Sequence, residues 1–383
     1  MAERKQTGRE QLAATATLFG TAVGAGLFGL PYIAAVAGFL PVAGMLLVLG
    51  VLMLYSNLMY GEIVQRTRQP YGIVGYARRY LGERGRRVAG LVSFFSLFAS
   101  NLIYIILGGV FLNAFFSPWL GGDEFFYATL TCTLAAAATY FNFRLFSAFE
   151  AWMVALMVLL VGAVVLRCVP HIEAANFLTL DPRQFFLPFG AVLFALGANA
   201  AIPGMSRMLG RKRARLRSAI GWGTVAYTAF YLVFIWAVLG VTGAGTSQEA
   251  FVGLSRALGD GVVTLGFGIG FLAVITSYLT SSECAKEILW YDYHLSERQA
   301  WLLATLVPYL LYLSGQRDFI RIIDIVGSIT GGFFGILIIL IFYAAKRKGD
   351  RQPAYSLEVS EGFAALMSLV FLLGIVYQFV YGF

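Results

Sequence analysis

The sequence predicts an all-α polytopic membrane protein, and three properties of the chain support this prediction. Of its 383 residues, 59% are hydrophobic and only 13% are charged, whereas about 25% of the residues of an average soluble domain are charged. Its mean hydropathy is +0.76, and its apolar runs are too long for the cores of globular domains. We therefore expect residues 1–383 to form a single transmembrane domain.

A membrane-spanning helix needs about 20 mostly apolar residues, and this requirement predicts eleven spans. They lie at residues 12–37, 39–65, 88–117, 124–141, 145–169, 185–209, 218–241, 262–288, 298–314, 319–345 and 359–382. If the N-terminus is cytoplasmic, only five of the 28 Lys and Arg residues face outside, namely Arg167, Arg183, Arg256, Arg317 and Arg321. This asymmetry follows the positive-inside rule, so we expect an integral protein of the cell membrane with its C-terminus outside.

The net charge of +8 does not indicate a nucleic-acid partner, because the basic residues lie in short inner loops such as RKRARLR at 211–217. There they set the topology and face membrane lipid. The three cysteines are far apart and form no C-x-x-C pair, so we expect no zinc site and no bound cofactor. The sequence also has no H-E-x-x-H, G-x-S-x-G or nucleotide-binding P-loop motif, which argues against an enzyme.

Two of the predicted spans contain residues that interrupt a helix. The first holds four glycines and Pro31 within TLFGTAVGAGLFGLP at 17–31. The sixth holds Gly190, Gly197, the polar Asn199 and Pro203. A glycine costs about 1 kcal/mol relative to alanine inside a helix and a proline about 3 kcal/mol. We therefore expect a break near Gly24–Gly26 and a corresponding break in the sixth span.

Each interruption alone has a simpler interpretation, because small residues also let membrane helices pack closely. Their spacing favours the break. The second interruption lies five spans after the first, so the halves 12–169 and 185–345 enter the membrane from opposite faces, as an inverted repeat requires. The segment 359–382 is then an additional eleventh helix. Backbone freed inside a membrane has to be paired or line a hydrated cavity, so two facing breaks predict a polar site at mid-membrane.

The ends of the half-helices predict what this site binds. The N–H groups of Ala25–Leu27 carry the positive end of a helix dipole and suit a carboxylate. The carbonyls freed in the two breaks, at Thr21, Ala22, Phe194 and Ala195, suit an ammonium group. A zwitterionic amino acid satisfies both sets. The predicted binding residues are Thr21, Ala22, Gly24, Ala25, Gly26, Leu27, Phe194, Ala195, Gly197 and Asn199, with Asn101 and Tyr104 of the third span as a cap over the ligand.

These motifs resemble those of the amino acid/polyamine/organocation superfamily with the leucine-transporter fold, closest to the aromatic amino acid permeases and the amino acid/auxin permeases. GTAVGAGLFGLP at 20–31 resembles the unwound substrate segment, and LFALGANAAIP at 193–203 resembles its partner. The likeness covers nearly the whole chain. It implies a symporter that imports amino acids by alternating access, and the small residues around Gly197 leave room for an aromatic or other large neutral side chain.

The same resemblance implies a coupling ion. AVITS at 273–277 is similar to the sodium site of that fold, which assigns as Na⁺ ligands the carbonyls of Gly20, Val23 and Ala273 and the hydroxyls of Thr276 and Ser277. Hydroxyls in a membrane helix also commonly bond back to their own helix, and that alternative stays open. Ala195 stands where some relatives carry a threonine of a second ion site, so we expect one coupling ion. The fifth span lacks the lysine of proton-coupled relatives, which favours sodium.

Charged side chains inside a span are costly and mark functional candidates. Glu283 and Lys286, and likewise Arg321 and Asp324, are three residues apart, a distance at which helical side chains can pair, and we expect them to form gate pairs. Glu150 has no local cation in its span, so it is the candidate carrier if protons drive transport. A proton-coupled permease and an amino acid sensor or channel built on the same scaffold are the alternatives.

Overall fold

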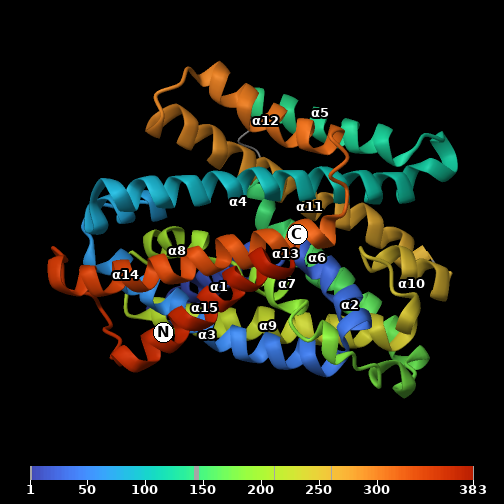
Figure 1. The fold of residues 1–383 in the computed structure, drawn as a ribbon, viewed down its shortest axis with the longest axis horizontal. Coiled ribbons are helices and arrows are strands. Elements are labelled where there is room, and N and C mark those ends of the chain that lie inside the picture. Colours follow the sequence, from blue (N-terminus) through green and yellow to red (C-terminus); the bar gives the residue numbers. More distant parts are fainter. Residues whose placement is uncertain (1, 142–145, 211, 260, 383) are drawn as a thin grey trace.

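The computed structural model of the chain describes residues 2–141, 146–210, 212–259 and 261–382. Within these ranges the regular structure is helical, without β-strands. The helices lie side by side in a compact bundle (Figure 1). The expected all-α architecture is therefore confirmed.

Eight helical segments of the described chain are long and apolar enough to cross a membrane, and a bent helix pair makes a ninth. The helices concerned are α1 (Ala2–Ala22) with α2 (Ala25–Ala37), α3 (Phe39–Arg66), α4 (Ile73–Leu120), α6 (Phe146–Cys168), α7 (Pro188–Ala195) with α8 (Ile202–Leu209), α9 (Arg215–Thr242), α11 (Gly261–Glu287), α13 (Phe319–Val326) with α14 (Gly332–Lys348), and α15 (Glu361–Tyr381). Two further predicted spans correspond to α5 (Glu124–Tyr140) and α12 (Glu297–Leu313), which have 17 residues each. Because these two are shorter than the usual span, eleven crossings stay a prediction.

The first predicted break lies between α1 and α2, where the chain bends by 55°. Gly24 adopts φ −135° and ψ −141°, far from helical values. Helix α2 then continues through Pro31, which is buried among apolar neighbours. The helix is therefore interrupted at the glycine, as predicted, and Pro31 is not the cause.

The second predicted break follows α7. Its last turn closes with the Gly197 N–H donating to the carbonyl of Phe194 at 3.1 Å, and a short 3₁₀ turn (Asn199–Ala201) leads into α8. Pro203 lies in the first turn of α8, where a missing N–H costs nothing because that turn has no helical acceptor. The proline therefore starts the second half of this broken helix.

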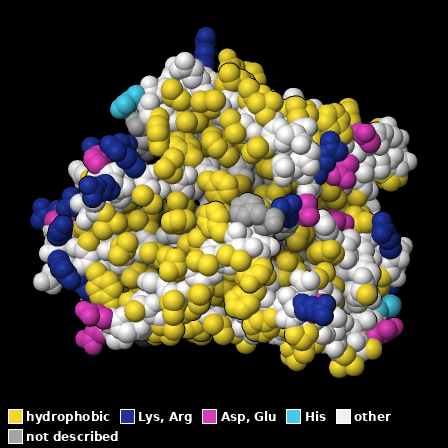
Figure 2. All heavy atoms as spheres, in the orientation of Figure 1, with side chains coloured by type: hydrophobic (Ala, Val, Ile, Leu, Met, Phe, Trp, Pro, Cys, Tyr) yellow, Lys and Arg dark blue, Asp and Glu magenta, His cyan; other side chains and the backbone are white. Residues whose placement is uncertain are grey.

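The two broken helices lie on one side of the long helix α4, and a smaller group of helices lies on its other side. In Figure 1, α5 and α12 run above α4, whereas α1, α3, α7 and α9 lie below it. Helix α9 packs against α1, α2 and α3, and α2 packs against α7. Helices α13 to α15 cross the front of the molecule in this view. Hydrophobic side chains cover much of this face (Figure 2), as expected for contact with lipid.

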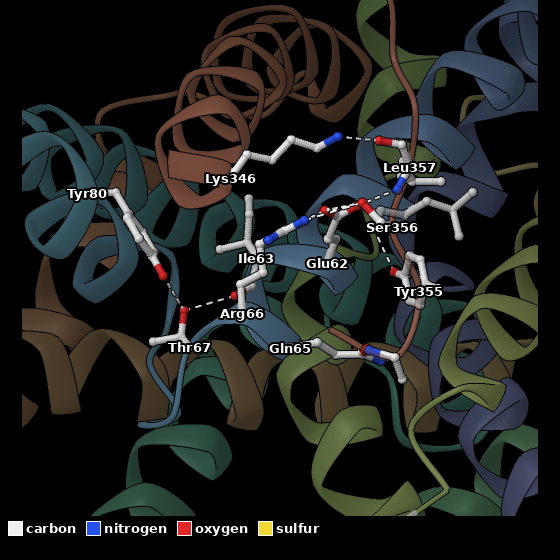
Figure 3. Close-up of polar contacts among 12 residues, drawn as sticks. Glu62, Ile63, Gln65, Arg66, Thr67, Tyr80, Lys346, Tyr355, Ser356 and Leu357 are labelled. Carbon is white, nitrogen blue, oxygen red and sulfur yellow. Dashed lines mark hydrogen bonds and ion pairs between the residues drawn. The ribbon is translucent and has the colours of Figure 1, made fainter. Parts of the chain in front are cut away.

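The segment that joins α14 to α15, residues 349–360, is bound to the end of α3, and we call it the C-terminal strap. Glu62 of α3 is fully buried and accepts hydrogen bonds from Arg66 Nε at 2.7 Å and from the Leu357 N–H at 2.6 Å. The Ser356 hydroxyl donates to the same carboxylate at 3.2 Å. Figure 3 shows these side chains converging on Glu62. A buried carboxylate thus ties the strap to the helical body.

Candidate functional site

The two breaks touch each other. A Cβ atom added to Gly26 would lie 2.7 Å from the Cα of Ala195 and 2.8 Å from its Cβ, which is closer than atoms of two residues can approach. The backbone of α2 therefore rests directly on that of α7, and a glycine is required for this contact. The prediction that the two interruptions face each other is confirmed.

A cavity of about 870 Å³ lies beside these breaks, within the size range of small-molecule sites. It brings together nine of the predicted binding residues: Thr21, Ala22, Gly24, Ala25, Gly26, Tyr104, Phe194, Gly197 and Asn199. The first N–H groups of α2, at Ala25 and Gly26, have no carbonyl one turn before them in their own helix. The wall thus offers the positive end of a helix dipole to a ligand.

Three predicted binding residues lie behind the cavity wall. The Leu27 N–H donates to the carbonyl of Gly24 at 3.1 Å, so this donor is already used. Asn101 is fully buried, and its amide donates to Ser282 of α11 at 3.1 Å. Asn101 therefore joins α4 to α11 and, unlike Tyr104, does not line the cavity. Ala195 contributes its backbone to the contact with Gly26.

The hydroxyl of Tyr231 in α9 forms hydrogen bonds with two of the carbonyls that we predicted to bind an ammonium group. Its hydroxyl lies 2.6 Å from the carbonyl oxygen of Ala22 and 2.9 Å from that of Ala195. The assignment of these two carbonyls as free acceptors is therefore corrected. The sequence pattern gave no indication of this contact, because no glycine, proline or charged residue lies within two helical turns of Tyr231.

A second cavity of about 260 Å³ adjoins the first, and all five predicted sodium ligands line it: Gly20, Val23, Ala273, Thr276 and Ser277. The two hydroxyls bond back to their own helix. Thr276 Oγ1 and Ser277 Oγ each lie 3.0 Å from the carbonyl of Ala273. Donating a proton leaves the lone pairs of a hydroxyl available, so these oxygens can still contact a cation.

The larger cavity extends to the loop between α3 and α4. Residues 70–72 of this loop and residues 73–75 at the start of α4 line it, together with Cys284 and Glu287 of α11. The loop is fixed by Asp350 of the C-terminal strap, whose carboxylate accepts from the Arg68 N–H at 3.0 Å and from Arg79 at 2.8 Å. This end of the cavity wall is therefore held by the strap.

One of the two predicted gate pairs is formed. Lys286 lies 3.0 Å from Glu283, and only 5% of the lysine side chain is exposed. The ammonium group is also 3.4 Å from the carbonyl of Thr139. Glu283 and Lys286 are thus a pair, as expected, at the end of α11.

The second predicted pair is wrong. In the described part of the chain, Arg321 and Asp324 form no ion pair with each other. Asp318 accepts from the Arg321 N–H at 3.1 Å and thereby caps α13, while the Arg321 side chain is exposed. Asp324 faces α7 instead, because its Oδ1 lies 2.4 Å from where a Cβ on Gly190 would be. The side chain of Glu150, the candidate proton carrier, lies outside the described residues.

One wall of the larger cavity was not predicted from the sequence. Gly327, Thr330, Gly331 and Phe334 line it from the π-helical turn Gly327–Gly331 and the start of α14. Glycines four residues apart place their bare backbone on one helix face. That spacing is visible in the sequence, but the prediction for this span concerned only Arg321 and Asp324.

The broken helices and their packing define the class of protein: a helical membrane protein with the leucine-transporter fold. Two solved structures are similar over 97% of this chain, each with a TM-score of 0.69. They are MhsT in complex with L-phenylalanine, at 17% identity over 98% of that chain, and the inward-facing conformation of Mhp1, at 12% identity over 90% of that chain.

The chain belongs to the tryptophan/tyrosine permease family, whose sequence pattern matches residues 7–381. Among its relatives, tyrosine-specific transport system 1 of Haemophilus influenzae is 25% identical over 88% of this chain and 89% of that protein. Tyrosine-specific transport system 2 of the same organism is 27% identical over 94% and 93%. The family and these relatives are transporters rather than enzymes, so this chain is an integral membrane protein that transports amino acids.

Proposed function

We propose that the protein is a secondary active symporter that imports aromatic or other large neutral amino acids together with Na⁺. The observation that carries this proposal is the contact between Gly26 and Ala195, which joins both half-helix breaks to one cavity. The N–H groups at Ala25 and Gly26 meet the carboxylate of the amino acid, and the carbonyl of Thr21 accepts from its ammonium group.

The cavity wall supports a large neutral side chain as cargo. Beyond the polar breaks it is lined by Leu193, Phe194 and Tyr104 and by the bare glycines of the π-helical turn. Aromatic and aliphatic walls favour an uncharged side chain by removing apolar surface from water. The two relatives named for tyrosine point to the same class of cargo.

The adjoining smaller cavity is the proposed Na⁺ site. Five neutral oxygens from α1 and α11, at Gly20, Val23, Ala273, Thr276 and Ser277, replace water around a hard cation. Because Val23 belongs to the break that also carries Ala22 and Gly24, ion and amino acid share one backbone segment. Binding of either one orders this segment for the other, which couples the two gradients.

The distribution of basic residues orients the protein in the cell membrane with its N-terminus in the cytoplasm. The C-terminal strap then lies on the cytoplasmic side, and the larger cavity opens inward. In this orientation the larger cavity serves the release of cargo into the cell. Alternating access is completed by rocking the broken helices against α4, α5, α11 and α12.

Proteoliposomes test this function with labelled tyrosine, tryptophan and leucine. We expect faster uptake under an inward Na⁺ gradient than under an equal K⁺ gradient, and exchange of internal for external substrate without any gradient. Uptake without such counterflow would indicate a channel, and binding without uptake would indicate a sensor. Acceleration by an inward proton gradient alone would replace sodium by protons in the proposal.

A further inference from the structure

We infer that Tyr231 is a positioning residue that joins the two broken helices into one substrate-binding unit. Its hydroxyl lies 2.6 Å from the carbonyl of Ala22, at the end of α1, and 2.9 Å from the carbonyl of Ala195, at the end of α7. The tyrosine is fully buried. One side chain of a third helix, α9, therefore contacts both interruptions at once.

The electrostatics of the two helix ends explain why a donor is needed here. Ala22 and Ala195 are the last residues of their half-helices, so both carbonyls lie at the negative ends of helix dipoles. Two such ends brought together repel each other, and neither carbonyl has a helical N–H one turn ahead to bond with. The Tyr231 hydroxyl places a shared proton between them, which offsets the repulsion and pairs both groups inside the membrane.

The consequence for the site rests on the proposed function. With Ala22 held by Tyr231, the neighbouring Thr21 lines both cavities and Val23 lines the smaller one. The orientation of one peptide segment thus sets the groups that meet the amino acid and those that meet the cation. Tyr231 touches neither ligand in this arrangement; it acts through the backbone that binds them.

Tyr227 provides a matched control on the same helix. It is fully buried and one turn before Tyr231, but its hydroxyl contacts Asn57 at 3.4 Å and Thr224 at 3.5 Å. These partners belong to α3 and α9, and neither is part of a break. Replacing either tyrosine by phenylalanine removes one buried hydroxyl, so the two variants have a similar effect on packing.

Transport kinetics of Tyr231→Phe and Tyr227→Phe test the positioning role. Losing a buried donor that serves two acceptors is expected to raise the KM for the amino acid and the half-saturating Na⁺ concentration about tenfold in Tyr231→Phe. The maximal rate should fall much less, and Tyr227→Phe should keep both constants within about twofold of the wild type. Equal shifts in the two variants, or no shift in Tyr231→Phe, would overturn the inference.

Hydrogen–deuterium exchange of the ligand-free protein in detergent gives a second test that does not depend on transport. Amides of residues 23–27 and 196–201 should exchange faster in Tyr231→Phe than in the wild type and in Tyr227→Phe. Wild-type exchange in both segments would contradict a role in holding the breaks. A wild-type protein without uptake or counterflow would refute the proposed function, while the exchange data would still decide the role of Tyr231.

Discussion

Gly26 rests on Ala195 with no room for a side chain between them, since an added Cβ would lie 2.7 Å from the Cα of Ala195. This contact joins a residue at the start of α2 to the last residue of α7. The larger cavity is thereby built from two segments far apart in the sequence. Its shape depends on a backbone contact, which only glycine at position 26 permits.

Substituting Gly26 by valine is expected to abolish uptake, because three added carbon atoms force α2 and α7 apart. Overpacking of this kind costs about 1–3 kcal/mol in a well-packed interior. Gly44→Val is the control, because nothing lies within 4 Å of a Cβ at that position, and it should transport within about twofold of the wild type. Uptake by Gly26→Val with an unchanged KM would show that the breaks need not touch.

Substituting Thr276 by alanine is expected to raise the half-saturating Na⁺ concentration at least about tenfold, as when an interaction of about 1.4 kcal/mol is lost. The hydroxyl lines the smaller cavity, and its lone pairs are the part of the residue that a cation contacts. Thr133→Ala removes a hydroxyl of α5 that bonds to its own helix at 2.8 Å and should leave the sodium dependence unchanged. If Thr276→Ala keeps the wild-type dependence, the ion site is wrongly assigned.

The parts of the fold that the sequence predicted are those that local chemistry decides. The break at Gly24 and the start of α8 next to Pro203 follow from the backbone preferences of single residues. Long apolar runs likewise fix where helices lie. The two segments predicted to bind the substrate could be recognised from the sequence because each contains glycines and a proline inside an apolar run.

The parts that could not be predicted depend on which way a helix faces. Tyr231 reaches Ala22 and Ala195 only because α9 presents that face to both breaks. Asp324 faces Gly190 rather than Arg321 for the same reason. Spacing along one helix indicates which residues share a face, but not which neighbour the face meets.

Substituting Glu62 by glutamine is expected to lower the stability of the protein by about 3 kcal/mol, because it removes the buried charge that pairs with Arg66, whose side chain is only 17% exposed. Glu62 is fully buried and accepts from Arg66 and from the strap at Leu357 (Figure 3). Glu83→Gln is the control, since that carboxylate pairs with Arg86 at 2.6 Å but is half exposed. Thermal unfolding in detergent should show a lower midpoint for Glu62→Gln and the wild-type midpoint for Glu83→Gln.

Cys284 should report the opening of the cavity to one side of the membrane. It lines both cavities, whereas Cys132 and Cys168 are buried, with 5% and 0% exposure. A membrane-impermeant maleimide is expected to label Cys284 from the strap side and to inhibit uptake, because the attached group blocks the path from the breaks. Bound amino acid is expected to slow this labelling. Cys284→Ala should resist inhibition, and Cys132→Ala should stay sensitive.

The side of labelling is read from oriented vesicles. Inside-out vesicles expose the strap side if the N-terminus is cytoplasmic, so they should be labelled faster than right-side-out vesicles. Faster labelling of right-side-out vesicles would reverse the orientation derived from the basic residues. Equal labelling from both sides with no protection by amino acid would mean that Cys284 lies outside the transport path, which would contradict the cavity as the route of the cargo.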